Sequence, residues 1–146
     1  MQIEAQWIVG FVDGEGCFHI SIPKNDKMAF GYQILPEFTI VQHERDVKVL
    51  YALKTYFGCG TVRVNRQDTR SLRMAYRVRK HEHLIKIICP FFMRHTLKTQ
   101  KNVDFRKFRR VCLLMHDKKH LTQEGFDTIR AIAVSMRRMR TDNTPI

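Results

Sequence analysis

The chain has 146 residues, of which 44% are hydrophobic, so it is long enough for one domain with a hydrophobic core and leaves little room for a second. Lysine and arginine total 26 against 14 acidic residues, and the formal net charge of +12 predicts a polyanionic partner: nucleic acid, an anionic membrane surface or an acidic protein. No apolar run approaches the roughly 20 residues that span a bilayer, and the first residues lack the basic leader of a secretory signal. We therefore expect an intracellular protein with no membrane segment, folded as a single domain over residues 1–146.

The hydrophobic periodicity predicts two successive units of one helix and one hairpin, followed by further helices. In chain order, the expected elements are a helix over 4–14, strands over 17–24 and 32–42, a helix over 45–57 that stops at Gly58, strands over 60–66 and 71–80, a helix over 82–93 interrupted at Pro90, and helices over 99–115 and 122–139. This order predicts an α+β fold of type αββαββα with C-terminal helices. Its four-stranded antiparallel sheet carries helices on one face and leaves the other face open.

The outward side of the predicted strands is polar and strongly basic. Arginine pairs well with guanine, asparagine and glutamine pair with adenine, and a two-stranded ribbon fits the major groove of B-DNA. Because the aromatic residues of these strands face inward, duplex DNA is favoured over single-stranded RNA. A solvated sheet surface would explain any one of these side chains, but it does not explain the cationic pattern as a whole. The candidate DNA contacts on the strands and at the hairpin tips are His19, Ser21, Lys24, Asn25, Lys27, Gln33, Leu35, Glu37, Thr39, Arg63, Asn65, Arg66, Gln67, Arg70, Arg73, Arg77 and Arg79.

Glu37 is an acid on this basic face. Its carboxylate would either accept a hydrogen bond from cytosine N4 or weaken phosphate binding by repulsion.

The four cysteines are dispersed and form no CxxC pair, which favours reduced, packed thiols over a zinc cluster. The polyanion is therefore the partner that the residues indicate most directly.

The end of the first predicted helix carries a specific motif. Residues 8–16 read Ile-Val-Gly-Phe-Val-Asp-Gly-Glu-Gly, and this stretch resembles the LAGLIDADG motif, with Gly14 in place of alanine and Glu15 in place of the final aspartate. Gly10 and Gly14 remove the side chains from one strip of the helix, so that a second helix can approach closely. An acid in the last turn meets the negative end of the helix dipole, a conflict that a bound cation resolves. The alternative is a helix that ends in Asp-Gly-Glu-Gly because these residues favour turns.

The resemblance implies a homing endonuclease of the single-motif, homodimeric type, since no second copy of the motif follows in the chain. It implies that Mg²⁺ is held by Glu15 of both subunits and by the main-chain oxygen of Gly14, and that the metal-bound water cuts both strands of a long, roughly palindromic DNA target. Asp13 is expected to support the helix junction rather than bind metal. The remaining residues that the resemblance implies are Gln42 for positioning the water, Lys101 or its rival Lys98 beside the scissile phosphate, and Trp7, Gly10, Phe11 and Gly14 at the dimer interface.

Three alternatives to the nuclease stay open at this point. An intron maturase that folds RNA and a DNA-binding regulator that has lost cleavage would both keep the motif. A basic ribosome-associated module would explain the charge without the motif. A gene inside an intron or intein would make homing the role, in a bacterial or archaeal cytoplasm or in a chloroplast or mitochondrion. The sequence assigns no role to the basic run at residues 137–140, Arg-Arg-Met-Arg.

Overall fold

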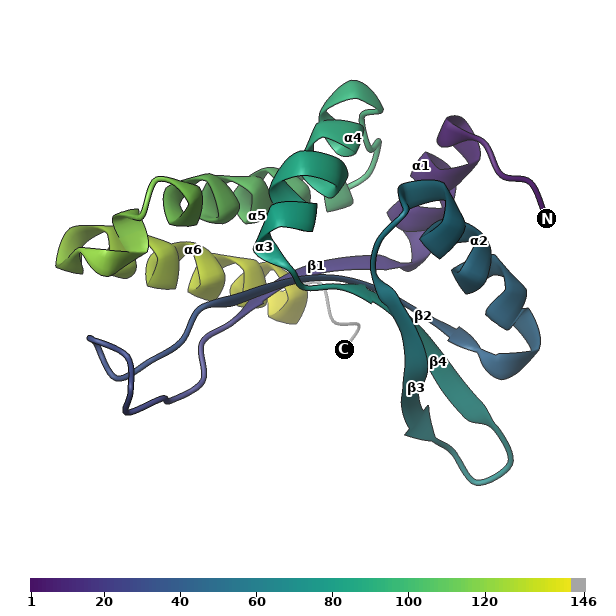
Figure 1. Cartoon of the computed structure of the whole chain (residues 1–146), viewed down its shortest axis with the longest axis horizontal. Helices are drawn as coiled ribbons and strands as arrows, with labels where there is room; N and C mark the ends of the chain where they lie inside the picture. Colours follow the sequence, from purple (N-terminus) through teal and green to yellow (C-terminus); the bar gives the residue numbers. More distant parts are fainter. Residues whose placement is uncertain (143–146) are drawn as a thin grey trace.

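The computed structural model describes residues 1–142, with side chains as far as Arg137 (Figure 1). The rest of the basic run at 138–140 therefore lies outside the described side chains. The first unit consists of α1 (Ala5–Glu15), β1 (Gly16–Ser21), β2 (Leu35–His43), the 3₁₀ turn η1 (Glu44–Asp46) and α2 (Val47–Phe57). The second unit and the tail consist of β3 (Thr61–Gln67), β4 (Leu72–Val78), α3 (His81–His83), the π-helical turn η2 (Leu84–Ile88), α4 (Cys89–Arg94), α5 (Lys101–His116), the 3₁₀ turn η3 (Lys119–Leu121) and α6 (Gln123–Asp142).

The four strands form one antiparallel sheet in the order β1-β2-β4-β3. Phe38 of β2 pairs with Phe18 of β1 on one side and with Val78 of β4 on the other, and all three side chains are buried. Because side chains alternate along a strand, Glu37 and Thr39 point to the opposite face. Helices cover the first face and leave the second open (Figure 1), which confirms the predicted α+β architecture.

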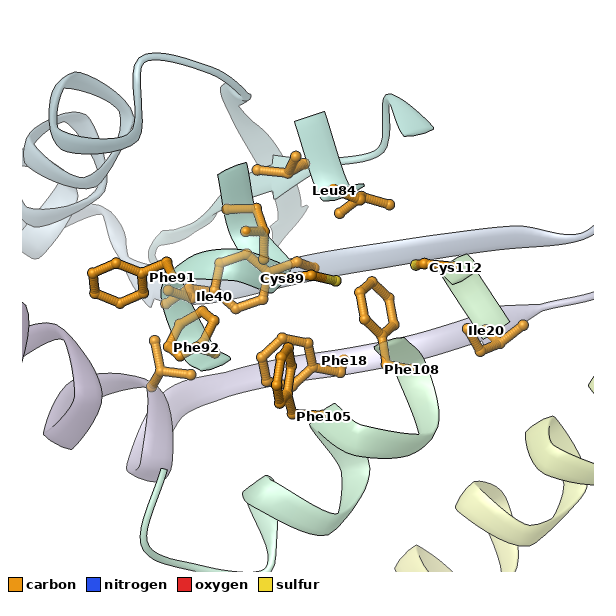
Figure 2. Packing of buried hydrophobic residues seen from close by; sticks show 14 of the residues in the cluster. Phe18, Ile20, Ile40, Leu84, Cys89, Phe91, Phe92, Phe105, Phe108 and Cys112 are labelled. Carbon is orange, nitrogen blue, oxygen red and sulfur yellow. The ribbon is translucent and has the colours of Figure 1, made fainter. Parts of the chain in front are cut away.

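The core is built around aromatic rings that join β1 to the helices. The ring of Phe18 lies 5.3 Å from Phe105 and 5.3 Å from Phe108, both on α5, and 5.5 Å from Phe92 on α4 (Figure 2). All four side chains are almost fully buried. Aromatic contacts of this kind stabilise a core beyond the area that they bury. They hold α5, which begins at Lys101, directly on the strand that follows α1.

The ends of the elements differ from the prediction where backbone chemistry or tertiary contacts decide. The ladder between the first two strands ends where Ser21 pairs with Leu35, so residues 22–34 form a longer loop than expected. Pro23 lacks the N–H group that a longer ladder needs at that position. Near Pro90 the helix changes to a π turn before the proline rather than ending at it, which is a common way to accommodate a disrupted helical hydrogen bond.

The second hairpin extends beyond the helical layer. By alternation Val64 shares a side of β3 with the buried Val62, yet it is 52% exposed because no helix covers the far end of β3. A β-bulge at Asn65 shifts the register, so that Arg66 rather than Asn65 lies opposite Arg73. Such a bulge increases the local twist of a hairpin. Among the described residues, no helix is both long and apolar enough to cross a bilayer.

Candidate active site and nucleic-acid interface

The chain passes from α1 into β1 without a loop. Glu15 is the last residue of α1 and is exposed, and Gly16 both caps the helix and begins the strand. A Cβ atom at Gly16 would lie 2.6 Å from Cγ1 and 2.9 Å from the carbonyl oxygen of Val12, so a larger residue would displace the helix end. The final glycine of the motif is thus a steric requirement, and it fixes the Glu15 carboxylate between two rigid elements.

Asp13 ties the end of α1 to the segment that precedes α5. Its Oδ2 accepts from the backbone N–H of Lys98 at 2.9 Å, and its Oδ1 accepts from the backbone N–H of Thr99 at 3.1 Å and from the Thr99 hydroxyl at 2.8 Å. Burial acts to raise the pKa of Asp13, but these hydrogen bonds outweigh it and hold the pKa below the usual value. The structure therefore agrees with the expectation that Asp13 supports the helix junction, and it adds Thr99, which the sequence did not single out.

The two candidate lysines have different surroundings. The Nζ of Lys101, the first residue of α5, donates to the carbonyl oxygen of Gly16, one residue from Glu15. The Nζ of Lys98 instead donates to the carbonyl oxygen of Thr96 at 3.0 Å. The hydroxyl of Thr99 also accepts from the Lys101 backbone N–H at 3.2 Å, so the contact of Asp13 extends to the start of α5. The Lys101 amine thus reaches the first residue of β1, whereas the charge of Lys98 acts on Asp13 and helps to lower its pKa.

Gln42 approaches the same junction from the sheet. Gly16 pairs with Ile40 of β2, so Gln42 lies two residues past the point where β1 begins, and it is half-buried. By strand alternation it shares the helix-facing side with Phe38 and Ile40. Gln42 is therefore set apart from the side chains of the open face and belongs with the end of α1.

The oxygen atoms at this junction suit a hard divalent cation, but one chain supplies few of them. The donors are the exposed carboxylate of Glu15 and the main-chain carbonyl of Gly14, and Mg²⁺ prefers six oxygen ligands, several of them water or phosphate. Across the described residues, no group of three or more His, Cys, Asp or Glu side chains is arranged to hold a metal. The donor set fits a metal site that is completed by other molecules.

The strip of α1 that carries Gly10 and Gly14 is open within the part of the chain that the structure describes. Cβ atoms built at Gly10 and Gly14 would meet nothing within 4 Å, although both glycines lie in a helix that is otherwise packed through Ile8 and Val12. Beside this strip, Trp7 is 45% exposed and its ring stacks on Phe11 with 4.8 Å between centroids. An exposed tryptophan next to a bare helical backbone is unusual on a solvated surface.

Glu37 holds two arginines on the open face of the sheet. Its carboxylate lies 3.0 Å from Nε of Arg77 and 3.0 Å from Nε of Arg79, and it accepts from the Thr39 hydroxyl at 2.6 Å. The Glu37 side chain is only 12% exposed, and this burial acts to raise its pKa. The hydrogen bonds from Thr39 and Arg79, together with the charges of Arg79 and His19, outweigh burial and lower the pKa. Glu37 is thus a fixed anion that orders part of the basic face.

Asp68 plays the same part at the tip of the second hairpin. Its two carboxylate oxygens lie 3.3 Å from Nε of Arg66 and 3.2 Å from Nε of Arg73. Arg77 also donates from Nη2 to Oδ1 of Asn65, the bulged residue. Asp68 lies in the turn between β3 and β4, and its pairing depends on the cross-strand register of Arg66 and Arg73, which a sequence of alternating residues does not reveal.

The remaining candidate contacts are spread over the open face and the two hairpin ends. Arg63 lies on β3, where its Nη1 donates to the Val62 carbonyl at 3.0 Å, and Leu35 is 41% exposed at the start of β2. The structure places the others as follows: His19 and Ser21 on β1, Gln67 at the end of β3, Arg70 in the β3–β4 turn, and Lys24, Asn25, Lys27 and Gln33 in the loop between β1 and β2. The predicted contacts therefore lie on the strands of the sheet and in the connections of both hairpins.

Known proteins share this arrangement. Residues 8–112 match the family model described as LAGLIDADG endonuclease. The chain is 34% identical over 127 residues to the probable intron-encoded endonuclease 3 of Neurospora crassa, an alignment that covers 87% of this chain and 23% of that protein. The chain thus spans about a quarter of the length of this curated relative.

Two solved structures are similar over almost the whole chain. The crystal structure of the homing endonuclease I-TnaI has a TM-score of 0.86 and 52% sequence identity, and the match covers 92% of this chain and 88% of that one. The structure of I-SmaMI bound to its uncleaved DNA target in the presence of calcium ions has a TM-score of 0.87 and 34% identity, over 94% of this chain and 46% of that one. The motif at the end of α1, the fold and these matches agree: the chain belongs to the LAGLIDADG endonuclease family.

Proposed function

We propose that this chain is a site-specific DNA endonuclease that works as a homodimer and makes a double-strand break in a long, roughly palindromic target. The observation that carries the proposal is the junction of α1 with β1, where Glu15 is exposed and the amine of Lys101 donates to the carbonyl oxygen of the next residue, Gly16. A carboxylate and a cation at one exposed point, next to a strongly basic sheet, are what phosphodiester hydrolysis on DNA requires. The printed names of the relatives support the same activity.

A dimer follows from the incomplete site and the bare strip of α1. One chain offers one carboxylate at the junction, and the strip of Gly10 and Gly14 lets the backbone of a second α1 come close. Packing two such helices would bring both Glu15 residues together. The match to I-SmaMI covers less than half of that longer chain, which supports a working unit of two such domains. In a homodimer, two-fold symmetry gives two equivalent half-sites on the DNA.

Each residue at the junction has a distinct part in the proposed reaction. Glu15 and the Gly14 carbonyl would hold Mg²⁺, which supplies Lewis-acid activation of water and neutralises the scissile phosphate. The Lys101 amine adds a fixed positive charge beside the developing negative charge on the phosphate oxygens. The Gln42 amide is able to orient a water molecule because it both donates and accepts hydrogen bonds. Asp13 keeps Lys101 in place through Thr99.

The biological setting is part of the proposal. The intron-encoded relative supports a gene that lies in an intron, where cutting an uninterrupted copy of the host sequence leads to homing. A DNA-binding regulator without cleavage, or a maturase that binds the intron RNA, is the competing function. Both would retain the basic face of the sheet, but neither needs the exposed carboxylate of Glu15.

The test is cleavage of DNA that the protein itself has selected. Duplexes bound by the purified chain are recovered from a randomised library and then incubated with it in the presence of Mg²⁺. We expect double-strand cutting by the wild type, and binding without cutting by Glu15→Gln and by Lys101→Met, with losses of at least about 100-fold in rate. Glu124→Gln and Lys54→Met, which change the same charges at exposed positions of α6 and α2, should cut at nearly the wild-type rate.

The outcomes separate the candidate functions. Selective binding of DNA without cutting by the wild type would point to a regulator, and preference for structured RNA over every duplex would point to a maturase. If Glu15→Gln cut as fast as the wild type, the assignment of the acid would be wrong even though the enzyme was a nuclease. If Lys98→Met rather than Lys101→Met lost cutting, Lys98 would be the lysine that acts beside the scissile phosphate.

A further inference from the structure

The loop between β1 and β2 has little support from the sheet. The regular ladder ends where Ser21 pairs with Leu35, and residues 22–34 extend beyond it. Within this loop the main-chain contacts are the Lys24–Tyr32 bridge, a hydrogen bond from Asn25 N to the Gly31 carbonyl at 2.8 Å and one from Gln33 N to the Pro23 carbonyl at 2.9 Å, along with short-range turn bonds. A two-stranded ribbon of this kind is marginally stable in water when nothing packs on it.

The side chains proposed to read DNA from this loop are nevertheless ordered. Asn25 Nδ2 donates to Oε1 of Gln33 at 3.2 Å, and Asn25 Oδ1 accepts from the Lys27 backbone N–H at 3.1 Å. These contacts link three of the four candidate DNA contacts in the loop. Their geometry persists only if the loop backbone keeps one conformation, so another part of the molecule has to hold it.

The start of α6 packs against the base of the loop through an aromatic cluster. Phe126 is 2% exposed, and its ring lies 5.2 Å from the ring of Phe30 and 6.3 Å from that of Tyr32. The guanidinium carbon of Arg130, one turn further along α6, lies 5.1 Å from the Tyr32 ring and 4.8 Å from the Phe126 ring. The contact of Arg130 with Tyr32 thus joins the helix to the loop, and its contact with Phe126 lies within α6. In Figure 1 the loop reaches out beside the corner where η3 meets α6.

This corner is itself rigid. Phe126, Ile129 and Ala133 place one face of α6 in the core. At the start of the helix, a Cβ atom at Gly125 would lie only 1.9 Å from the carbonyl oxygen of Lys119, so α6 begins in close contact with η3. The loop is therefore braced by an element that the core fixes, although that element lies outside the sheet.

We infer that Arg130 and Phe126 are positioning residues for DNA recognition: they hold the β1–β2 loop in its reading conformation, and base discrimination at the outer end of each half-site depends on them. The inference rests on the proposed function. A loop that is ordered before binding loses less conformational freedom on the DNA, and its polar side chains meet base edges in one geometry. Without the brace, Asn25 and Gln33 would still reach the DNA, but with several geometries that tolerate more than one base.

The first measurement needs no DNA. We expect Arg130→Ala to speed the amide hydrogen exchange of Asn25 and Gln33 by about two- to fivefold, the factor that corresponds to one exposed cation–π contact. Arg130→Lys should restore most of the protection because it keeps a cation over the rings. Arg110→Ala, which removes an exposed arginine of α5 outside this cluster, should leave both amides unchanged. Tyr32→Leu should match Arg130→Ala, and the double variant should add little further effect.

The second measurement is a position-resolved base preference, obtained by selection from the randomised library. For the wild type, a wrong base at an outer position should cost roughly tenfold in affinity. In Arg130→Ala the ratio of affinities for the right and the wrong base should approach one at the outer positions only. The base preference at the positions nearest the cleavage site should stay as in the wild type. A merely structural defect would weaken all positions together or lower the midpoint of thermal unfolding.

Two results would overturn the inference. One is unchanged exchange of the Asn25 and Gln33 amides in Arg130→Ala, and the other is an unchanged outer base preference despite faster exchange. Either result leaves the proposed nuclease intact, because the wild-type chain would still select and cut DNA. Failure of the wild type to select any duplex would instead remove the proposed function, whatever the exchange data showed.

Discussion

At the scale of single residues, the candidate site depends on side chains that do no chemistry themselves. Asp13 accepts from two successive backbone N–H groups and a hydroxyl on a segment 85 and 86 positions away in sequence. These contacts set where α5 begins and so where the Lys101 amine meets Gly16. In this arrangement, the first acid of the motif, Asp13, supports the site, whereas the fourth residue of Asp-Gly-Glu-Gly, Gly16, closes the helix.

The low pKa of Asp13 leads to a prediction for stability. Because the folded-state pKa lies below the unfolded one, ionised Asp13 stabilises the fold above its ordinary pKa, and this contribution is lost as the pH falls through the lowered value. Asp13→Asn should therefore lower the free energy of unfolding by about 1 kcal/mol at pH 7 and by less at pH 3. Urea unfolding at the two pH values measures the difference.

The same variant should affect catalysis more than binding. Since Asp13 acts through Thr99 on Lys101, Asp13→Asn should slow DNA cutting while the dissociation constant for the target changes little. Equal stability losses at both pH values would contradict the ionised carboxylate as the source, and an unchanged cutting rate would contradict its link to Lys101.

At the scale of elements, the open face of the sheet is organised by two acids. Glu37 pairs with Arg77 of β4 and with Arg79, which follows that strand. Asp68 pairs with Arg66 of β3 and with Arg73 of β4. Each acid reduces the net charge of the face but fixes two guanidinium groups that would otherwise move freely. Fixed guanidinium groups match a given base or phosphate geometry better than mobile ones.

Removing the charge of Glu37 should therefore strengthen binding to DNA in general and weaken discrimination. In Glu37→Gln, Arg77 and Arg79 are released to contact phosphates, so the slope of log affinity against log salt should steepen by about 1 to 2. The free energy of unfolding should fall by about 1 kcal/mol, because the arginine partners are in part exposed. Asp117→Asn, which removes one exposed charge from the helical layer, is the matched control.

Binding isotherms on target and non-target duplexes at several salt concentrations provide the measurement. If Glu37 accepts from a cytosine, as its position also permits, Glu37→Gln should lose affinity for the target at every salt concentration instead. A slope equal to that of the wild type would show that the two arginines do not turn to phosphate when released.

The sequence predicted the elements well because most of them have clear periodicity. Strands β1 and β2 and helix α2 follow from alternation and from the glycine at 58, which adopts a positive φ of 70° after the helix. The bulge at Asn65 and the length of the loop before Leu35 depend on twist and on packing against α6, which no local pattern contains. Lys98 and Lys101 lie three positions apart, and only the contacts of Asp13 decide which amine reaches the junction.

At the scale of the whole molecule, α1 carries a strip that the described part of the chain leaves uncovered. Cβ atoms at Gly10 and Gly14 would meet nothing within 4 Å there, so the fold of a monomer does not explain these two glycines. Glycine inside a helix lowers stability by about 1 kcal/mol relative to alanine. A surface that retains two of them is best explained by close approach of another helix.

Substitution at this strip should separate folding from assembly. A Cβ atom at Gly10 would meet nothing within 4 Å, so the Gly10→Leu monomer should fold with an unfolding midpoint at least equal to that of the wild type. In the proposed dimer the same side chain would collide with the partner helix, and cutting should fall to the level of Glu15→Gln. Sedimentation velocity and a cleavage assay measure the two effects. Ala131→Leu, which adds a leucine at an exposed position of α6, should remain a dimer and cut, and a dimeric, active Gly10→Leu would place the interface elsewhere.

Because no loop separates α1 from β1, these two elements move together as one rigid unit. Gly16 ends the helix and begins the strand, so no flexible segment absorbs a rotation between them. Strand β1, from Gly16 to Ser21, spans roughly 17 Å. A tilt of α1 by about 12° thus moves the end of the strand by about 3.4 Å, the spacing of one base-pair step. In the proposed dimer, the crossing angle of the two glycine strips sets the distance between the two DNA half-sites. Small changes at that strip would therefore alter the length of the DNA target without any change to the residues that contact the DNA.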